Sequence, residues 1–245
     1  MARLTRHELK EHEFEDTIEN LQEFARQYAK QIIIGVAAVV LVTGAIEGWR
    51  LYNENQAAAA NAGLAEALKT FQAPVSAAPV NLFSSNPEPQ PTNGQFASDQ
   101  AKYKAAVAQF SAVAAKYPRQ KAGDFARYYV GLCQSAMGDD AAAEKTLTSV
   151  ARLSDKDAAA LADLALAGDL AKAGKTAEAA KVYQALAQHP ASTVPRATAL
   201  LAEADLYRNS QPAQARALYE QLAKEVGSDS YLASTIHQQI ESLPK

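Results

Sequence analysis

The sequence predicts an all-α protein in which a single N-terminal transmembrane helix precedes a solenoid of helical hairpins. Three observations favour this fold class. Hydrophobic residues make up 48% of the 245-residue chain, and much of that share is alanine, which favours helices over sheets. One segment, residues 31–46, is apolar and carries no charge. The C-terminal half repeats its residue pattern with a period of thirty-six residues.

Residues 1–30 are predicted to form an acidic, amphipathic helix. This segment contains five Lys/Arg and seven Asp/Glu residues. Its apolar side chains fall on one helical stripe, formed by Phe14, Ile18, Leu21, Ala25 and Tyr28. The stripe is typical of a helix that docks on a partner or lies on a membrane surface. A solvated extension of the following helix explains it equally well, because short amphipathic helices are marginal alone.

Residues 31–49 are predicted to cross a membrane. The uncharged run covers about 24 Å, short of the roughly 30 Å hydrocarbon core of a bilayer. Flanking residues of the kinds found at membrane interfaces extend the span: Tyr28, Lys30, Trp49, Arg50 and Tyr52. The alternatives are a buried helix of a soluble protein and a cleaved signal peptide, which the preceding thirty glutamate-rich residues disfavour. The Lys/Arg balance favours a cytoplasmic N-terminus.

Residues 50–72 are predicted to continue as a helix, the first of an irregular hairpin whose second helix covers about 102–117. Between them, residues 73–98 contain half of the chain's ten prolines. This composition predicts an irregular spacer inserted between the two helices. A short linear binding motif within the segment NLFSSNPEPQP is the alternative.

Residues 99–245 contain the internal repeat. Gly138, Gly174 and Ser210 lie thirty-six residues apart at equivalent turns. Four further columns keep this register: Ala143, Ala179 and Ala215; Leu147, Tyr183 and Tyr219; Val150, Leu186 and Leu222; Ala151, Ala187 and Ala223. A small residue lets the two helices of a hairpin approach closely, and a bulky one fills the space to the next hairpin. Hairpins of this kind bury their apolar faces by stacking on each other.

The repeat resembles the tetratricopeptide repeat, most closely at Gly131, Gly138-Asp139, Ala143 and Leu147. Ala167 and Glu203 replace the first-helix glycine in the later units, and residues 229–243 resemble a polar-faced cap. The resemblance implies a concave protein-binding groove lined by Phe125, Tyr128, Leu132, Leu161, Leu164, Leu200, Tyr207 and Arg208. Such a groove suits an amphipathic helix or an apolar client segment. The alternative is that the chain's own helix 50–71 fills it.

Catalytic, cofactor and metal motifs are not evident in the sequence, so we expect a protein that is not an enzyme. Glu8 and His12 lie one helical turn apart, but an exposed pair without supporting groups is a poor metal site. Cys133, the only cysteine, is expected to be a packed thiol. The net charge of −3 is evenly spread, which disfavours nucleic acid as a partner. Gly44 and Gly48 form a small-residue pair that suits another membrane helix.

The whole layout resembles the YfgM family of bacteria, ancillary subunits of the Sec translocon. The likeness rests on the acidic N-terminal helix, the single anchor, the repeat domain and the junction Gly48-Trp49-Arg50-Leu51-Tyr52-Asn53. The resemblance implies a single-pass inner-membrane protein with a cytoplasmic N-terminus and a periplasmic repeat domain. The Pro-rich insertion departs from the family pattern.

The resemblance also implies partners and a role. The partners are the SecYEG translocon, a membrane-anchored periplasmic chaperone of the prolyl-isomerase type, and unfolded or translocating polypeptides. The role is that of an adaptor assisting the hand-over of clients. One alternative stays open, a periplasmic scaffold for envelope assembly or cell division. An enzyme regulated by its repeat domain is disfavoured by the missing site.

Overall fold

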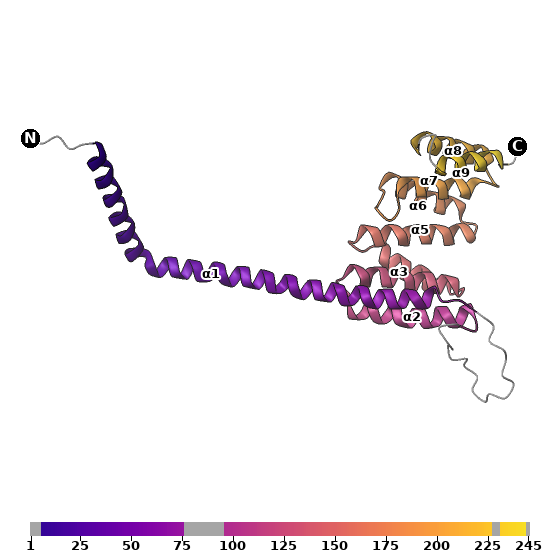
Figure 1. Cartoon of the computed structure of the whole chain (residues 1–245). Helices are drawn as coiled ribbons and strands as arrows, with labels where there is room; N and C mark the ends of the chain where they lie inside the picture. Colours follow the sequence, from indigo (N-terminus) through magenta and orange to yellow (C-terminus); the bar gives the residue numbers. More distant parts are fainter. Residues whose placement is uncertain (1–5, 76–95, 227–230, 244–245) are drawn as a thin grey trace, which may run out of the picture. The chain divides into compact units, whose positions relative to one another are not determined.

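The computed structural model describes the backbone of residues 6–75, 96–226 and 231–243, and the side chains of residues 28, 30, 31, 33–75, 96–226 and 233–243. Within these ranges the chain forms nine α-helices and one isolated bridge, between Val75 and Phe96. The residues divide into two units, Met1–Asn55 and Gln56–Lys245. The predicted all-α class is confirmed (Figure 1).

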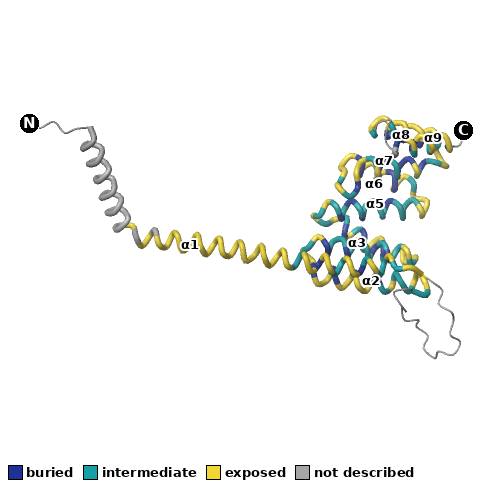
Figure 2. The backbone as a smooth tube through the Cα atoms, viewed as in Figure 1, coloured by how far each residue is buried: buried dark blue, intermediate teal, exposed yellow. Residues whose placement is uncertain are grey.

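The first unit consists of the N-terminal part of helix α1 (Arg6–Phe71). Every described side chain between residues 28 and 55 is exposed (Figure 2). The apolar ones are among them, with Leu41 74% and Ile34 68% accessible. The helix is long and apolar enough to cross a membrane from Ile33 onward. Of the amphipathic stripe predicted within residues 1–30, the side chains before Tyr28 lie outside the described residues.

The second unit begins with the C-terminal end of α1, which packs against α2 (Asp99–Lys116). Ala60 and Ala67 of α1 are buried, in the same core as Phe110 of α2. The ring of Phe71 lies with its centroid 6.3 Å from that of Phe110. A Cβ atom added at Gly63 would lie 3.1 Å from Val113, so this small residue permits the close approach of the two helices.

Three further hairpins and a capping helix stack on this pair (Figure 1). In each hairpin the first helix lies beside the second, because a short turn between two helices makes them antiparallel neighbours. In chain order the helices are α3 (Lys121–Ala136), α4 (Asp140–Ala151), α5 (Lys156–Lys172), α6 (Thr176–Gln188), α7 (Arg196–Tyr207), α8 (Pro212–Val226) and α9 (Tyr231–Glu241).

The turns follow from their residues. Gly138 and Gly174 adopt positive φ angles of 79° and 75°, a conformation that ends a helix and that side chains disfavour. Asp139 then caps α4 by accepting a hydrogen bond from the backbone N–H of Ala142 at 3.3 Å. The third turn has Ser210 in place of glycine, and there the N–H of Gln211 bonds the Tyr207 carbonyl at 2.8 Å.

The repeat register is confirmed by burial. The three alanines of the first column and the large residues of the next two columns are all buried. In the fourth column Ala187 is buried, while Ala151 and Ala223 are half-buried. The buried residues form three cores: one around Phe110, one around Leu147 and one extending from Ala160 to Leu243.

The third unit departs from the others at the small-residue position of its first helix. Glu203 occupies this position and is only 3% accessible. The side-chain amide of Gln184 in α6 donates a 2.7 Å hydrogen bond to its carboxylate. A buried carboxyl group needs such a donor, so the exchange of a small residue for glutamate joins two successive hairpins by a polar contact.

Other polar contacts also join successive hairpins, and their partners lie about one repeat apart in sequence. They are the hydrogen bonds from Ser135 to Asp169 at 3.0 Å, from Ser192 to Asp157 at 2.5 Å and from Arg208 to Ser242 at 2.6 Å. Because such contacts recur along the stack, they help to set the spacing of neighbouring hairpins, in addition to the apolar packing.

Candidate protein-binding surfaces

The residues predicted to line the groove belong to α3, α5 and α7, and they differ in how they pack. Phe125 and Leu132 on α3 are half-buried, and neither belongs to any of the three cores. Half-buried residues that do pack against a core are Tyr128, Leu161 and Leu164. Leu200 and Tyr207 on α7 are buried core residues. Arg208 is half-buried and donates a hydrogen bond to Ser242 beyond α9.

Within this set, Phe125 and Leu132 are the side chains best placed to contact a partner. They lie seven residues apart on α3, which puts them on one helical face two turns apart. Neither side chain packs against one of the three cores, so truncating them should cost the fold less than truncating a core residue. Leu200 and Tyr207, by contrast, hold the third hairpin together.

Gly168 on α5 is a feature that the groove prediction did not include. It follows Leu161 by seven residues and Leu164 by four, so all three lie on one face of the helix. A Cβ atom at Gly168 would meet nothing within 4 Å. Glycine inside a helix is less stable than alanine by about 1 kcal/mol, and no packing contact here requires it. A glycine inside an alanine-rich helix was the signal that could have identified this position.

The chain's own helix α1 packs on the neighbouring face of α3. Phe71 lies 5.5 Å from Tyr129, centroid to centroid, and Tyr129 stacks on Phe110 at 5.0 Å. Ala126 and Cys133 of α3 belong to the same core as these rings. Tyr129 follows Phe125 by four residues and precedes Leu132 by three, so the contacts of α1 residues 56–71 lie directly beside the face of Phe125 and Leu132.

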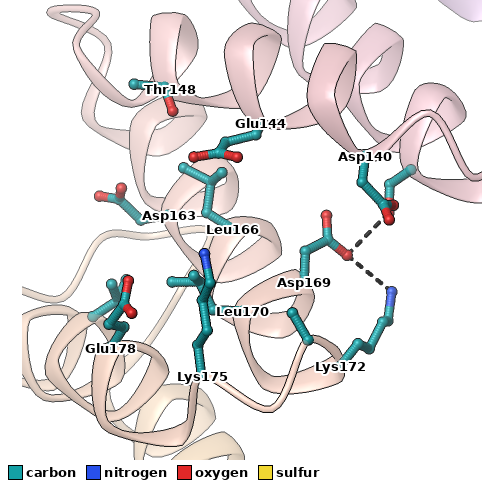
Figure 3. A pocket seen from close by; sticks show the side chains of 13 residues that line it. Asp140, Glu144, Thr148, Asp163, Leu166, Asp169, Leu170, Lys172, Lys175 and Glu178 are labelled. Atoms are coloured by element: carbon teal, nitrogen blue, oxygen red, sulfur yellow. Dashed lines mark hydrogen bonds and ion pairs between the residues drawn. The ribbon is translucent and has the colours of Figure 1, made fainter.

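A cleft of about 550 Å³ lies on another face of α5, between the second helices α4 and α6 (Figure 3). Leu166 and Leu170 of α5 and Val182 of α6 supply its apolar surface. Asp140 and Glu144 line it from α4, at a spacing of four residues that puts both on one face of that helix. None of the predicted groove residues lines this cleft.

Five carboxylates and two lysines line the cleft, so its net charge is negative. Asp169 has partners within the protein, because its Oδ1 accepts 3.0 Å hydrogen bonds from Ser135 Oγ and from Lys172 Nζ. Across the part of the chain that the structure describes, the other four carboxylates form no ion pair and accept no hydrogen bond: Asp140, Glu144, Asp163 and Glu178. Burial raises the pKa of the Asp163 carboxyl above its usual value, and no cation offsets that effect.

The residues predicted at the membrane interface are all exposed. The rings of Trp49 and Tyr52 lie 6.5 Å apart. Arg50 lies 3.7 Å from Glu47 and 4.0 Å from Glu54 along the same helix face. Pairing of this kind reduces the cost of placing Glu47 near the end of an apolar span.

Groups that could support catalysis are few in the described residues. The Cys133 thiol is buried, and that burial raises its pKa to about 12, so it is a poor nucleophile. Searched over the same residues, His, Cys, Asp and Glu side chains form no cluster of three or more that could hold a metal ion. His189 ends α6, where its backbone N–H bonds the Ala185 carbonyl at 2.9 Å.

Comparison with known proteins agrees with this architecture. No curated protein and no solved structure matched the chain. A family model described as a tetratricopeptide repeat-like domain matches residues 22–245, which include the apolar part of α1 as well as all the hairpins. The chain therefore belongs to the tetratricopeptide repeat-like domain family.

Proposed function

We propose that this protein is a membrane-anchored adaptor that binds other polypeptides through the concave face of its first helices and catalyses no reaction. Tetratricopeptide repeat-like domains are interaction modules, which supports a role in protein binding. The observation that carries the proposal is the partial exposure of Phe125 and Leu132, which pack against none of the three cores, together with Gly168, where an added Cβ atom would meet nothing within 4 Å.

The anchor is the exposed apolar stretch of α1. Between Ile33 and Ile46 the helix presents apolar side chains on all sides, and none is buried by the protein. A soluble protein does not leave such a surface in water, because apolar area of this extent drives association or membrane insertion. Tyr28 and Lys30 at one end, with Trp49, Arg50 and Tyr52 at the other, would lie at the two interfaces.

The concave face suits an amphipathic helix of a partner. Phe125 and Leu132 offer apolar side chains on α3, and Leu161 and Leu164 offer them on α5. Gly168 leaves the backbone of α5 uncovered. A partner helix can approach closely at such a point, as it does where small residues face each other between packed helices.

The resemblance to the YfgM family supports a more specific role. The adaptor would associate with the SecYEG translocon and a membrane-anchored periplasmic chaperone, and would assist the hand-over of translocating polypeptides. The N-terminus would lie in the cytoplasm and the repeat domain in the periplasm of the bacterial inner membrane. The excess of Lys/Arg on the N-terminal side of the anchor supports this orientation.

The direct test is copurification of the full-length protein after extraction in mild detergent. We expect translocon components and a membrane-anchored chaperone among the retained proteins, with both reduced in the Phe125→Ala/Leu132→Ala variant. Lys145→Ala/Arg152→Ala, which alters two exposed side chains on the other side of the hairpin, is the matched control. Absence of translocon components would refute the specific role, and retention of outer-membrane or division proteins would favour a scaffold instead.

The orientation has its own test. A reporter enzyme active only outside the cytoplasm, fused after Lys245, should be active, and a reporter active only in the cytoplasm should not. The opposite result would place the repeat domain in the cytoplasm and exclude periplasmic partners.

A further inference from the structure

The cleft between α4, α5 and α6 combines three properties that the repeat architecture does not require. It is an open space of about 550 Å³, a volume typical of ligand pockets. Its surface includes Leu166, Leu170 and Val182. Its carboxylates outnumber its lysines, and among the described residues most of these carboxylates have no partner. Three of the unpaired carboxylates are exposed at the rim of the cleft, and Asp163 alone is half-buried, where a polar group is normally paired.

Among the unpaired carboxylates of the cleft, Asp163 is the most buried. It lies half-buried on α5 at the edge of the cleft, near Leu166 and Glu144 (Figure 3). No lysine or arginine of the described chain reaches its carboxylate. Burial without a nearby cation raises the pKa of the Asp163 carboxyl, because the ionised form loses part of its solvation. A cation of a partner molecule would stabilise the ionised Asp163 carboxylate, since its hydrogen bonds would replace the lost solvation.

Lys175 is the cation of the cleft that could pair with the free carboxylates, but it does not do so. It lines the cleft from the turn between α5 and α6, and its side chain extends toward Leu166 (Figure 3). It forms no ion pair with any of the described carboxylates. Lys172, the other lysine of the cleft, is already bound to Asp169 at 3.0 Å. The free carboxylates therefore remain available to an external cation.

We infer that this cleft binds a basic side chain of a partner polypeptide, with an apolar neighbour of that side chain seated on Leu166 and Val182. Charge complementarity selects an arginine-bearing segment, because a guanidinium can bond two carboxylates at once and tolerates partial burial. This inference rests on the protein-binding role proposed above but not on the concave face. On α5 the cleft residues Asp163, Leu166 and Leu170 point away from Gly168, so the two surfaces can be occupied independently.

The test uses full-length protein in detergent and two labelled ten-residue peptides, read by fluorescence anisotropy. Both peptides are alanine-rich and carry a leucine; one has an arginine three residues from the leucine, and the other has glutamine there. We expect the arginine peptide to bind about tenfold more tightly, as a charge-assisted hydrogen bond predicts. Equal binding of the two peptides would overturn the inference.

Variants assign the preference to the cleft. Asp163→Asn/Glu178→Gln should abolish the preference for arginine, whereas Glu220→Gln/Glu241→Gln, which removes two exposed carboxylates outside the cleft, should retain it. Lys175→Gln should strengthen binding of the arginine peptide, because it removes the competing positive charge. A preference that survives Asp163→Asn/Glu178→Gln in a protein of unchanged helicity would exclude this cleft.

Two further outcomes separate the competing explanations. Displacement of the arginine peptide by millimolar calcium, but not by sodium chloride at equal ionic strength, would identify a cation site and overturn the inference. The Phe125→Ala/Leu132→Ala variant should keep its arginine preference. If this variant loses its copurifying partners but still prefers the arginine peptide, both proposed surfaces are supported. If the wild-type protein retains its partners but shows no preference for arginine, the cleft proposal is refuted and the concave-face proposal is not.

Discussion

Gly131 faces the side chain of Leu147 so closely that a Cβ atom at position 131 would lie 2.6 Å from a methyl carbon of the leucine. Both residues are buried, one on each helix of the α3–α4 hairpin. The missing side chain of one residue therefore makes room for the full side chain of the other. This packing explains why the first position of the tetratricopeptide-like pattern is a glycine in this hairpin.

Gly131→Ala should destabilise the repeat domain by about 1–3 kcal/mol, because overpacking forces side chains or backbone to shift. Leu147→Ala should also destabilise it, by about 2–5 kcal/mol, because it leaves a cavity. The double variant should be less destabilised than the sum of the two, because the new methyl group fills part of that cavity. Urea unfolding followed by circular dichroism measures all three, and strictly additive effects would contradict the contact.

Ala179 is the small residue of the second repeat unit, and it is fully buried in α6. Ala179→Leu should lower stability by about 1–3 kcal/mol, since the α5–α6 hairpin has no room for the larger side chain. Ala177→Leu, two residues away on the exposed face of the same helix, should leave the melting temperature nearly unchanged. Equal melting temperatures for the two variants would show that the repeat register is misplaced.

Gly168 should respond to substitution in opposite ways in stability and in binding. Gly168→Ala should stabilise the protein by up to about 1 kcal/mol, because alanine favours the helix and its Cβ meets no neighbour. Gly168→Leu should fold normally but reduce the copurification of partners. Ala217→Leu, on an exposed position of α8, is the control. A Gly168→Leu variant that retains all partners would place the binding surface elsewhere.

Cys133 should make the stability pH-dependent above neutrality. Its folded pKa is raised to about 12 by burial, whereas an unfolded cysteine has a pKa of about 8.5. Stability is therefore complete below about pH 8.5 and falls as the pH rises toward 12, by up to about 1.4 kcal/mol per pH unit. Cys133→Ala should show a smaller decrease between pH 8 and 10, in denaturation experiments at each pH.

The same burial predicts the reactivity of this thiol. In the native protein, Cys133 should resist alkylation by iodoacetamide at pH 8, and it should react fully after unfolding in urea. Rapid alkylation of the native protein would mean that the α1–α3 core opens readily.

The sequence predicts the hairpins, the turns and the alanine columns well, because each depends on residues close together in the chain or on a strict period. Gly138 and Gly174 end their helices through backbone geometry alone. The pairing of α1 with α2 across the Pro-rich segment was also predictable, because a first helix was missing from the pattern. The places where one predicted segment of the long helix gives way to the next were not predictable, since its polar and apolar stretches form one continuous α1.

The candidate sites were less accessible to sequence reasoning. Tyr128 and Leu164 were expected to face a groove, and both half-buried side chains also pack against cores, which the sequence does not indicate because side-chain direction depends on the rotation of each helix against its neighbours. Their truncation would therefore affect folding as well as binding, and Phe125 with Leu132 is the cleaner pair. The acidic cleft depends on the separation of α4 from α6, which no residue pattern within one repeat determines.

The apolar packing of the repeat domain is divided unevenly among its three cores. The middle core contains four buried residues, Leu147, Val150, Ala158 and Ala162, while the cores on either side are larger. Of the three cores, the middle one therefore has the fewest buried side chains holding its helices together. We expect local opening between α4 and α5 to cost less free energy than opening within either of the larger cores.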